Sequence, residues 1–268
     1  MKFTIISPKE YDYNIGGVCA LYSLKKELEQ RQQIADIKIV PNWYANSSIN
    51  NELDDEIVII PEIYPYNPLG HKNIVRWMLN IPTNIQGYKS SDKIFLCSNE
   101  YRFNIKNIED TLLPISYNIF DPFYNKNLPR NGTCYLVRKA KDKPLIYHPE
   151  NALNIDDYAQ KGGNEYLNTI FNTCKRFICY DHACALATFS ALCGCETVII
   201  PDGIRGLEQA MLQHPAYLFG LAWGFYDINR AMATQKLLPL RINELKILAK
   251  IYIDIFLEKC SKSFINGV

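Results

Sequence analysis

The chain has 268 residues, which is enough for one large domain or for two domains of about 130 residues each. Its 48% hydrophobic content can form a proper core, and its formal net charge of +1 argues against nucleic acid as a partner. The nine cysteines are odd in number and scattered among apolar neighbours, and no secretory signal is evident, so we expect reduced thiols in a cytoplasmic protein.

Apolar runs in the first half of the chain alternate with helical patterns. Residues 16–31 have the 3.6-residue period of a helix, and a second helix is expected at 71–79, before Pro82. Five apolar runs are expected to form strands: 2–7, 36–40, 55–60, 94–98 and 112–115. Strands that alternate with helices predict a parallel sheet covered on both faces.

A second alternation follows the segment 121–132, whose Pro, Gly and Asn residues make it the best candidate for a linker. Strands are expected at 134–138, 145–148, 177–179 and 197–200. Helices are expected at 163–174, 183–192, 205–213 and 241–262. The fold predicted is therefore α/β, with two Rossmann-like α/β/α domains at 1–122 and 131–268 and a long C-terminal helix.

Membrane contact would need a long apolar run or an amphipathic surface. No window holds about 18 uncharged apolar residues, so we expect no transmembrane segment. The helix at 241–262 is amphipathic and is expected to pack on the core, although its pattern leaves peripheral membrane contact open.

Two features of the first half could contribute to a binding site. Gly16 and Gly17 follow the first strand and open a helix, where free backbone N–H groups and the missing Cβ atoms let an anion or a hydroxyl approach. A tight turn alone would also explain the pair. Glu62 follows the third strand, where its carboxylate could be a general base or simply an exposed loop acid.

In the second half, the candidates lie at strand ends, where the ligands of open parallel sheets bind. Arg138 and Lys139 carry the charge that a diphosphate requires, although a solvated turn has the same composition. Tyr180, Asp181 and His182 directly follow the strand expected at 177–179. Asp181 could contact a sugar hydroxyl, or it could only cap the helix that follows.

Two further residues could line this second site. Thr188 lies on the helix after the acidic turn and would reach a phosphate only from the side that faces the ligand. His148 ends a predicted strand and, like His71 and His214, has no partner at metal-ligand spacing. No HExxH motif and no DxD motif at a strand end is present, so we expect no metal and no cofactor.

Three segments carry a resemblance to a known family: NIGGVCALYSLKKELEQR, YNPLGHKNIVRWMLNIP and ICYDHACALATFSALCGCETVIIPD. In that order, they resemble the Gly-rich loop with its first helix, an acceptor-side segment and the donor-side block of the GT-B glycosyltransferases. The likeness is greatest to the bacterial and viral enzymes that build surface polysaccharides. In this family two Rossmann-like domains face a central cleft.

The resemblance implies metal-independent transfer of a sugar from a nucleotide diphosphate sugar to a hydroxyl of a glycan or glycolipid. It implies that Gly16 and Gly17 lie at the cleft. It also implies that Arg138 and Lys139 neutralise the diphosphate, and that Asp181 lies near the donor.

One motif of the family is missing. Many retaining members have E-x7-E, whereas Asp181 is followed at that spacing by Phe189, so the stereochemistry of the transfer stays open. The alternative function is that of a non-catalytic nucleotide- or sugar-binding α/β protein, such as a degenerate transferase acting as a partner subunit. An epimerase would need GxGxxG and YxxxK motifs, and neither is present.

Overall fold

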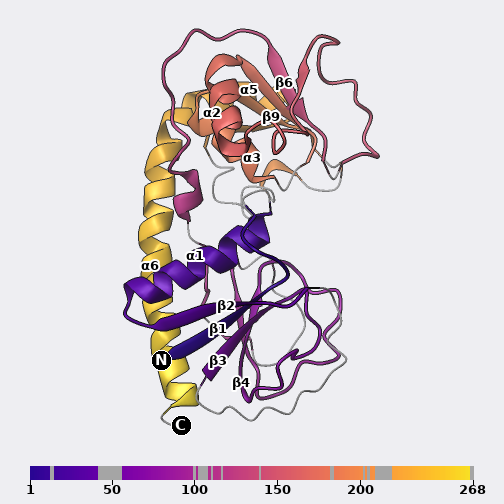
Figure 1. Cartoon of the computed structure of the whole chain (residues 1–268). Coiled ribbons are helices and arrows are strands. Elements are labelled where there is room, and N and C mark those ends of the chain that lie inside the picture. The colour runs from indigo at the N-terminus through magenta and orange to yellow at the C-terminus, as the bar shows by residue number, and fades with distance from the viewer. Residues whose placement is uncertain are drawn as a thin grey trace. The chain divides into compact units, whose positions relative to one another are not determined.

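Two parallel sheets of five strands each form the framework of the chain (Figure 1). The computed structural model describes residues 1–12, 15–41, 56–98, 101, 108–109, 111–115, 117–138, 140–181, 184–201, 203, 206–208 and 219–265. The chain divides into two compact units. The first comprises Met1–Ser116 with Lys246–Val268, and the second comprises Tyr117–Leu245.

The first sheet contains β1 (Lys2–Ser7), β2 (Ile34–Ile39), β3 (Glu56–Pro61), β4 (Asn73–Met78) and β5 (Lys93–Leu96). All of its strand pairs are parallel, in the order β2-β1-β3-β4-β5. The strand order reverses between β1 and β3, and ligands of such sheets bind outside the carboxyl ends of the strands at this switch point.

One face of the first sheet is covered by α1 (Gly16–Gln30) and by the later part of α6 (Leu238–Phe264). The ring of Phe256 on α6 lies 6.0 Å from that of Phe3 and 4.9 Å from that of Phe95, measured between centroids. A single aromatic side chain of α6 therefore packs on both β1 and β5.

The opposite face of the first sheet buries a charged pair. Arg76, in β4, has no exposed surface, and its Nε donates to Asp92 Oδ2 at 2.9 Å. Its Nη1 donates to the carbonyl oxygens of Tyr64 (3.0 Å) and Tyr66 (3.2 Å). The guanidinium also lies 4.4 Å from the ring centroid of Tyr88. Arg76 thus holds two irregular segments of the chain on this face.

The second sheet contains β6 (Thr133–Leu136), β7 (Leu153–Asn154), β8 (Arg176–Cys179), β9 (Glu196–Ile199) and β10 (Leu221–Trp223). Its strands are parallel, in the order β10-β9-β8-β6-β7. Counted from the start of the unit, both sheets have the order 2-1-3-4-5. The switch point of the second sheet therefore lies between β6 and β8.

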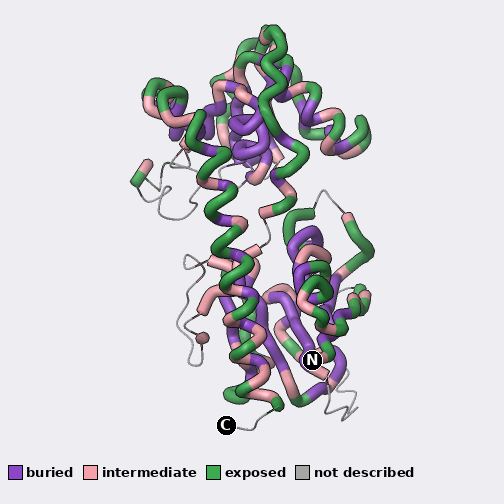
Figure 2. The backbone as a smooth tube through the Cα atoms, turned by 90° about the vertical axis from the view of Figure 1, so that its left-hand side faces the viewer, coloured by how far each residue is buried: buried purple, intermediate pink, exposed green. Residues whose placement is uncertain are grey.

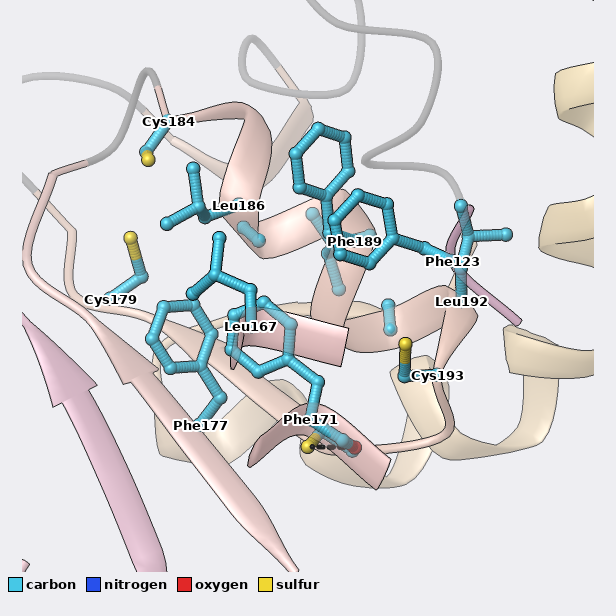
Figure 3. Packing of buried hydrophobic residues seen from close by; sticks show 14 of the residues in the cluster. Phe123, Leu167, Phe171, Phe177, Cys179, Cys184, Leu186, Phe189, Leu192 and Cys193 are labelled. Atoms are coloured by element: carbon cyan, nitrogen blue, oxygen red, sulfur yellow. Dashed lines mark hydrogen bonds between the residues drawn. The ribbon is translucent and has the colours of Figure 1, made fainter. Parts of the chain in front are cut away.

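Helices lie on both faces of the second sheet. α2 (Gly163–Thr173), α3 (Ala185–Leu192) and the start of α6 pack on one face, and α5 (Ile228–Thr234) packs on the other. Short 3-10 turns lie at Tyr117–Phe120 (η2), Phe225–Asp227 (η4) and Gln235–Leu237 (η5). Figure 3 shows the packing around α3, where the ring of Phe189 stacks on that of Phe123 at 4.0 Å.

The predicted linker, 121–132, contains no helix or strand, and Arg130 holds it in place. The Arg130 Nη1 donates to the carbonyl oxygens of Phe171 (2.7 Å) and Cys174 (3.1 Å), at the end of α2. Its Nη2 donates to the carbonyl oxygen of Cys193, at the end of α3. A cation is favourable at helix C-termini, so Arg130 stabilises both helices.

α6 contributes to both cores. Leu238, Ile242 and Leu245 are buried in the second unit, whereas Ile253 and Phe256 are buried in the first. Figure 2 shows buried and exposed residues alternating along this helix. The predicted domain 131–268 included all of α6, whereas the division by packing assigns its last part, from Lys246, to the first unit.

Three predicted elements were wrong. Residues 71–79 form no helix, because their central part is strand β4, which is buried on both faces and so lacks an alternating pattern. Residues 112–115 form no strand, since Pro114 has no N–H for a ladder. Residues 145–148 form no strand either, because Pro144 and Pro149 flank them, and the short β7 pairs with β6 instead. Most of the helix predicted at 205–213 lies outside the described residues.

Candidate functional site

Gly16 and Gly17 form the exposed first turn of α1, at the carboxyl end of β1. The N-cap, Ile15, makes no side-chain capping bond, and the first turn has no acidic residue. Neither glycine has a positive φ, and a Cβ added at Gly16 would meet no atom within 4 Å. The fold therefore does not require glycine at position 16. The pair leaves the N-terminal N–H groups of α1 open to an approaching ligand.

Glu62 follows β3, at the same edge of the first sheet. Its Oε2 accepts a hydrogen bond from the backbone N–H of Leu79 at 3.1 Å. Burial raises the pKa of Glu62 above its ordinary value, although the backbone N–H groups of Leu79 and of Glu62 itself lower it. A Cβ at Gly17 would lie 3.9 Å from Leu79 Cδ1. The structure therefore brings Glu62 and the glycine pair together around Leu79, at the switch point of the first sheet.

Arg138 lies at the corresponding position of the second sheet, just after β6. Its backbone has a φ of 44°, a left-handed conformation that is unfavourable for a side chain with a Cβ. The carboxylate of Asp156 accepts hydrogen bonds from the N–H groups of Val137 (3.1 Å) and Arg138 (2.9 Å). Successive backbone N–H groups of this kind form an anion-binding nest. Asp156 fills the nest, so the backbone N–H of Arg138 already has its acceptor.

Asp181 lies two residues after the end of β8 and is 6% exposed. It was a candidate N-cap for the next helix, but the N-cap is Cys184 and α3 begins at Ala185, so that interpretation was wrong. Cys184 makes no side-chain capping bond, and the first turn of α3 has no acid. The charge of Asp181 acts on Arg138, whose Nη1 lies 3.7 Å from Cys184 Sγ. Arg138, Asp181 and the start of α3 therefore meet at one switch point.

Tyr180 and His148 lie on the other face of the second sheet. The Tyr180 hydroxyl is 2.8 Å from His148 Nδ1, and the imidazole stacks on Tyr135 at 3.6 Å. Burial lowers the pKa of His148. Lys143 Nζ donates to the carbonyl oxygens of Tyr180 (2.9 Å) and Ile200 (2.8 Å). These contacts hold the segment after β6 on the sheet, so Tyr180 and His148 are separated from the group around Arg138.

The other predicted site residues lie elsewhere. Thr188 is in α3 with 1% of its surface exposed, so its hydroxyl is closed to a ligand in this conformation. Phe189, at the position where the family's second acid would stand, is buried in the core of the second unit. Lys139 lies outside the described residues, as does His182.

Sequence reasoning missed Asp156 at the second switch point, Lys143 on the other face of the sheet, and Cys184 at the start of α3. The first two contact backbone atoms that are distant in the sequence, and no local sequence motif predicts such contacts. Cys184 was interpreted as a small core residue because its neighbours are apolar. The position of Cys184 between a strand end and a helix start was the signal from which its place in the site could have been predicted.

No group of three or more His, Cys, Asp or Glu side chains among the described residues could hold a metal ion. In that same part of the chain, no helix is both long and apolar enough to cross a membrane. Comparison with known proteins finds no matching family model and no matching curated protein. A functional assignment therefore depends on the geometry of the two switch points.

Proposed function

We propose that the chain is a metal-independent glycosyltransferase of the GT-B type, which moves a sugar from a nucleotide diphosphate sugar to a hydroxyl of a glycan or glycolipid. The observation that supports this proposal best is the meeting of Arg138, Asp181 and the start of α3 at the switch point of the second sheet. Nucleotides bind to open parallel sheets at such points.

The donor would bind at this second switch point. When the sugar leaves, negative charge develops on the diphosphate, and a guanidinium next to free helix N–H groups stabilises that charge. Arg138 would supply the guanidinium, and Lys139 would supply a second cation. The carboxylate of Asp181 would accept a hydrogen bond from a hydroxyl of the donor. The Asp156 carboxylate would keep Arg138 in place through its backbone.

The acceptor would bind at the first switch point, near Gly16 and Gly17. A general base works best when its pKa approaches the working pH. Burial raises the pKa of Glu62 in this direction. Glu62 would take the proton of the acceptor hydroxyl as that oxygen attacks the anomeric carbon and the bond to the diphosphate breaks. This step requires the two units to face each other across a cleft, which is part of the proposal.

Thermal unfolding in the presence of nucleotide diphosphates and nucleotide sugars tests the donor site. A ligand at 100 times its Kd stabilises the native state by about 2.7 kcal/mol, which raises the Tm by several degrees. Arg138→Ala combined with Lys139→Ala should abolish the shift. Lys141→Ala, two residues further along and exposed, is the matched control and should retain it. If no nucleotide diphosphate shifts the Tm, the proposal is wrong.

Turnover separates the two candidate functions. A transferase should hydrolyse the donor slowly or glycosylate a suitable acceptor, and Glu62→Gln should lose this activity while still binding the nucleotide. Glu10→Gln changes an exposed acid in the loop after β1 and should behave as the wild type. Binding without any turnover would instead assign the chain to the non-catalytic nucleotide- or sugar-binding class.

A further inference from the structure

Two thiols face each other across the turn that joins β8 to α3. Cys179 is the last residue of β8 and has no exposed surface, and Cys184 is the N-cap of α3 with 5% exposed. The Cys179 thiol lies 3.1 Å from the carbonyl oxygen of Asp181, to which it donates, and it also interacts with the Cys184 thiol. Figure 3 shows their sulfur atoms pointing toward one another. Both thiols are free.

The surroundings of the two sulfur atoms differ in a way that favours a thiolate on Cys184. The hydrogen bond with Cys179 lowers the pKa of Cys184, burial raises it, and the charge of Arg138, 3.7 Å away, lowers it again, so that the net pKa is lowered. A helix N-terminus also favours a thiolate. Burial raises the pKa of Cys179 well above its ordinary value. Cys184 is therefore the residue that we expect to attack as a thiolate. Cys179 remains a protonated thiol beside it.

We propose that Cys184 and Cys179 form a peroxide-reactive pair, in which Cys184 is oxidised first and Cys179 then closes a disulfide. The Cys184 thiolate attacks one oxygen of hydrogen peroxide, the O–O bond breaks, and the hydroxide that leaves takes up a proton to become water. The sulfur of Cys179 then attacks that of Cys184, the S–O bond breaks, and a second water leaves with the Cys179 proton. The thiol pair loses two electrons and the peroxide gains them.

A second pair in the same unit provides an internal comparison. Cys134 interacts in the same way with Cys174, and this contact, together with the charge of Arg130, lowers the pKa of Cys174 as well. However, Cys174 lies at the C-terminus of α2, where the helix dipole disfavours a thiolate. In addition, Arg130 donates to the carbonyl oxygens of Phe171, Cys174 and Cys193. We therefore expect this pair to react more slowly than Cys179 and Cys184.

The remaining buried thiols of this unit are still less reactive. Burial raises the pKa of Cys193 to about 11 and that of Cys195 to about 12. A thiol with such a pKa contains almost no thiolate at neutral pH. Arg138 takes part in both proposals, but the pair chemistry needs only side chains of this chain and a peroxide, so it does not require a bound nucleotide.

Limited oxidation of the full chain tests the proposal. The reduced protein is treated with equimolar hydrogen peroxide at pH 7, free thiols are blocked with N-ethylmaleimide, and the peptides are mapped by tandem mass spectrometry. The expected first product is a disulfide between Cys179 and Cys184. Arg138→Met should slow its formation about tenfold by reducing the thiolate fraction of Cys184. Cys184→Ser should abolish it, and Cys174→Ser, the control, should leave it unchanged.

Several results would overturn the proposal. They are a first disulfide between Cys134 and Cys174, oxidation of Cys184 to the sulfinic acid with Cys179 still alkylated, and an unchanged rate in Arg138→Met. The mapping on the wild-type protein decides the first two even if a variant fails to fold. If the thiol chemistry is not observed, the prediction of nucleotide binding is unaffected, so each proposal is tested by its own experiment.

Discussion

Replacing Arg76 with methionine tests how far one buried guanidinium holds the first unit together. The substitution leaves Asp92, which is 2% exposed, without its cation, although the N–H of Lys89 still donates to it at 3.2 Å. It also removes the donor to the carbonyl oxygens of Tyr64 and Tyr66. Loss of one member of a buried pair costs about 3–5 kcal/mol, and each buried carbonyl left unpaired adds about 1–3 kcal/mol. We expect a loss of about 5 kcal/mol or more.

Urea unfolding followed by tryptophan fluorescence measures this loss. Trp77 is buried in β4 next to Arg76, so it reports on the first unit once Trp43 and Trp223 are replaced with phenylalanine. The double variant Arg76→Met with Asp92→Leu removes both charges and should be more stable than Arg76→Met alone. A loss below about 1 kcal/mol, or a double variant less stable than the single one, would refute the reasoning.

Three further predictions concern single side chains. Gly87→Ala should lower the urea midpoint clearly, because its Cβ would lie 2.3 Å from a backbone oxygen, whereas Gly16→Ala meets open space and should not. Asp156→Ala removes the acceptor of two backbone N–H groups and should weaken nucleotide diphosphate binding about tenfold. Calorimetry measures this affinity, and an equal loss of affinity in Asp157→Ala would contradict a specific role of Asp156. Burial raises the folded-state pKa of Glu62, so its stabilising contribution is present below about pH 4 and is lost as the pH rises through the folded pKa. Glu62→Gln should therefore be more stable than the wild type at pH 7 and equal to it at pH 4, and a difference that does not grow with pH would exclude this cause.

Local patterns were sufficient to predict much of the architecture. The alternation of strands with helices predicted an α/β chain with two parallel sheets and a long C-terminal helix, and the structure confirms this. The β8 and α3 elements follow the patterns of 177–179 and 183–192 closely. β4 was missed because a strand buried on both faces has no period of two. Arg76, inside it, finds its partners only through the tertiary fold.

The candidate site was predictable to a smaller extent. Glycines and charged residues at strand ends indicated both switch points, because the topology of parallel sheets fixes where such ends gather. The roles of Arg138, Asp181 and Glu62 stay predictions. What the sequence could not show is how these side chains are held. The Asp156 carboxylate reaches Arg138 from 18 residues along the chain, and such contacts have no local signature.

The position of Phe256 has a consequence for how the protein is made. Its ring completes the core between Phe3 and Phe95, although Phe3 is synthesised long before Phe256. The second unit, Tyr117–Leu245, is continuous and can fold before the last part of α6 has been synthesised. We therefore expect the first unit to finish folding after the second, with its hydrophobic surface exposed until the last part of α6 has been released.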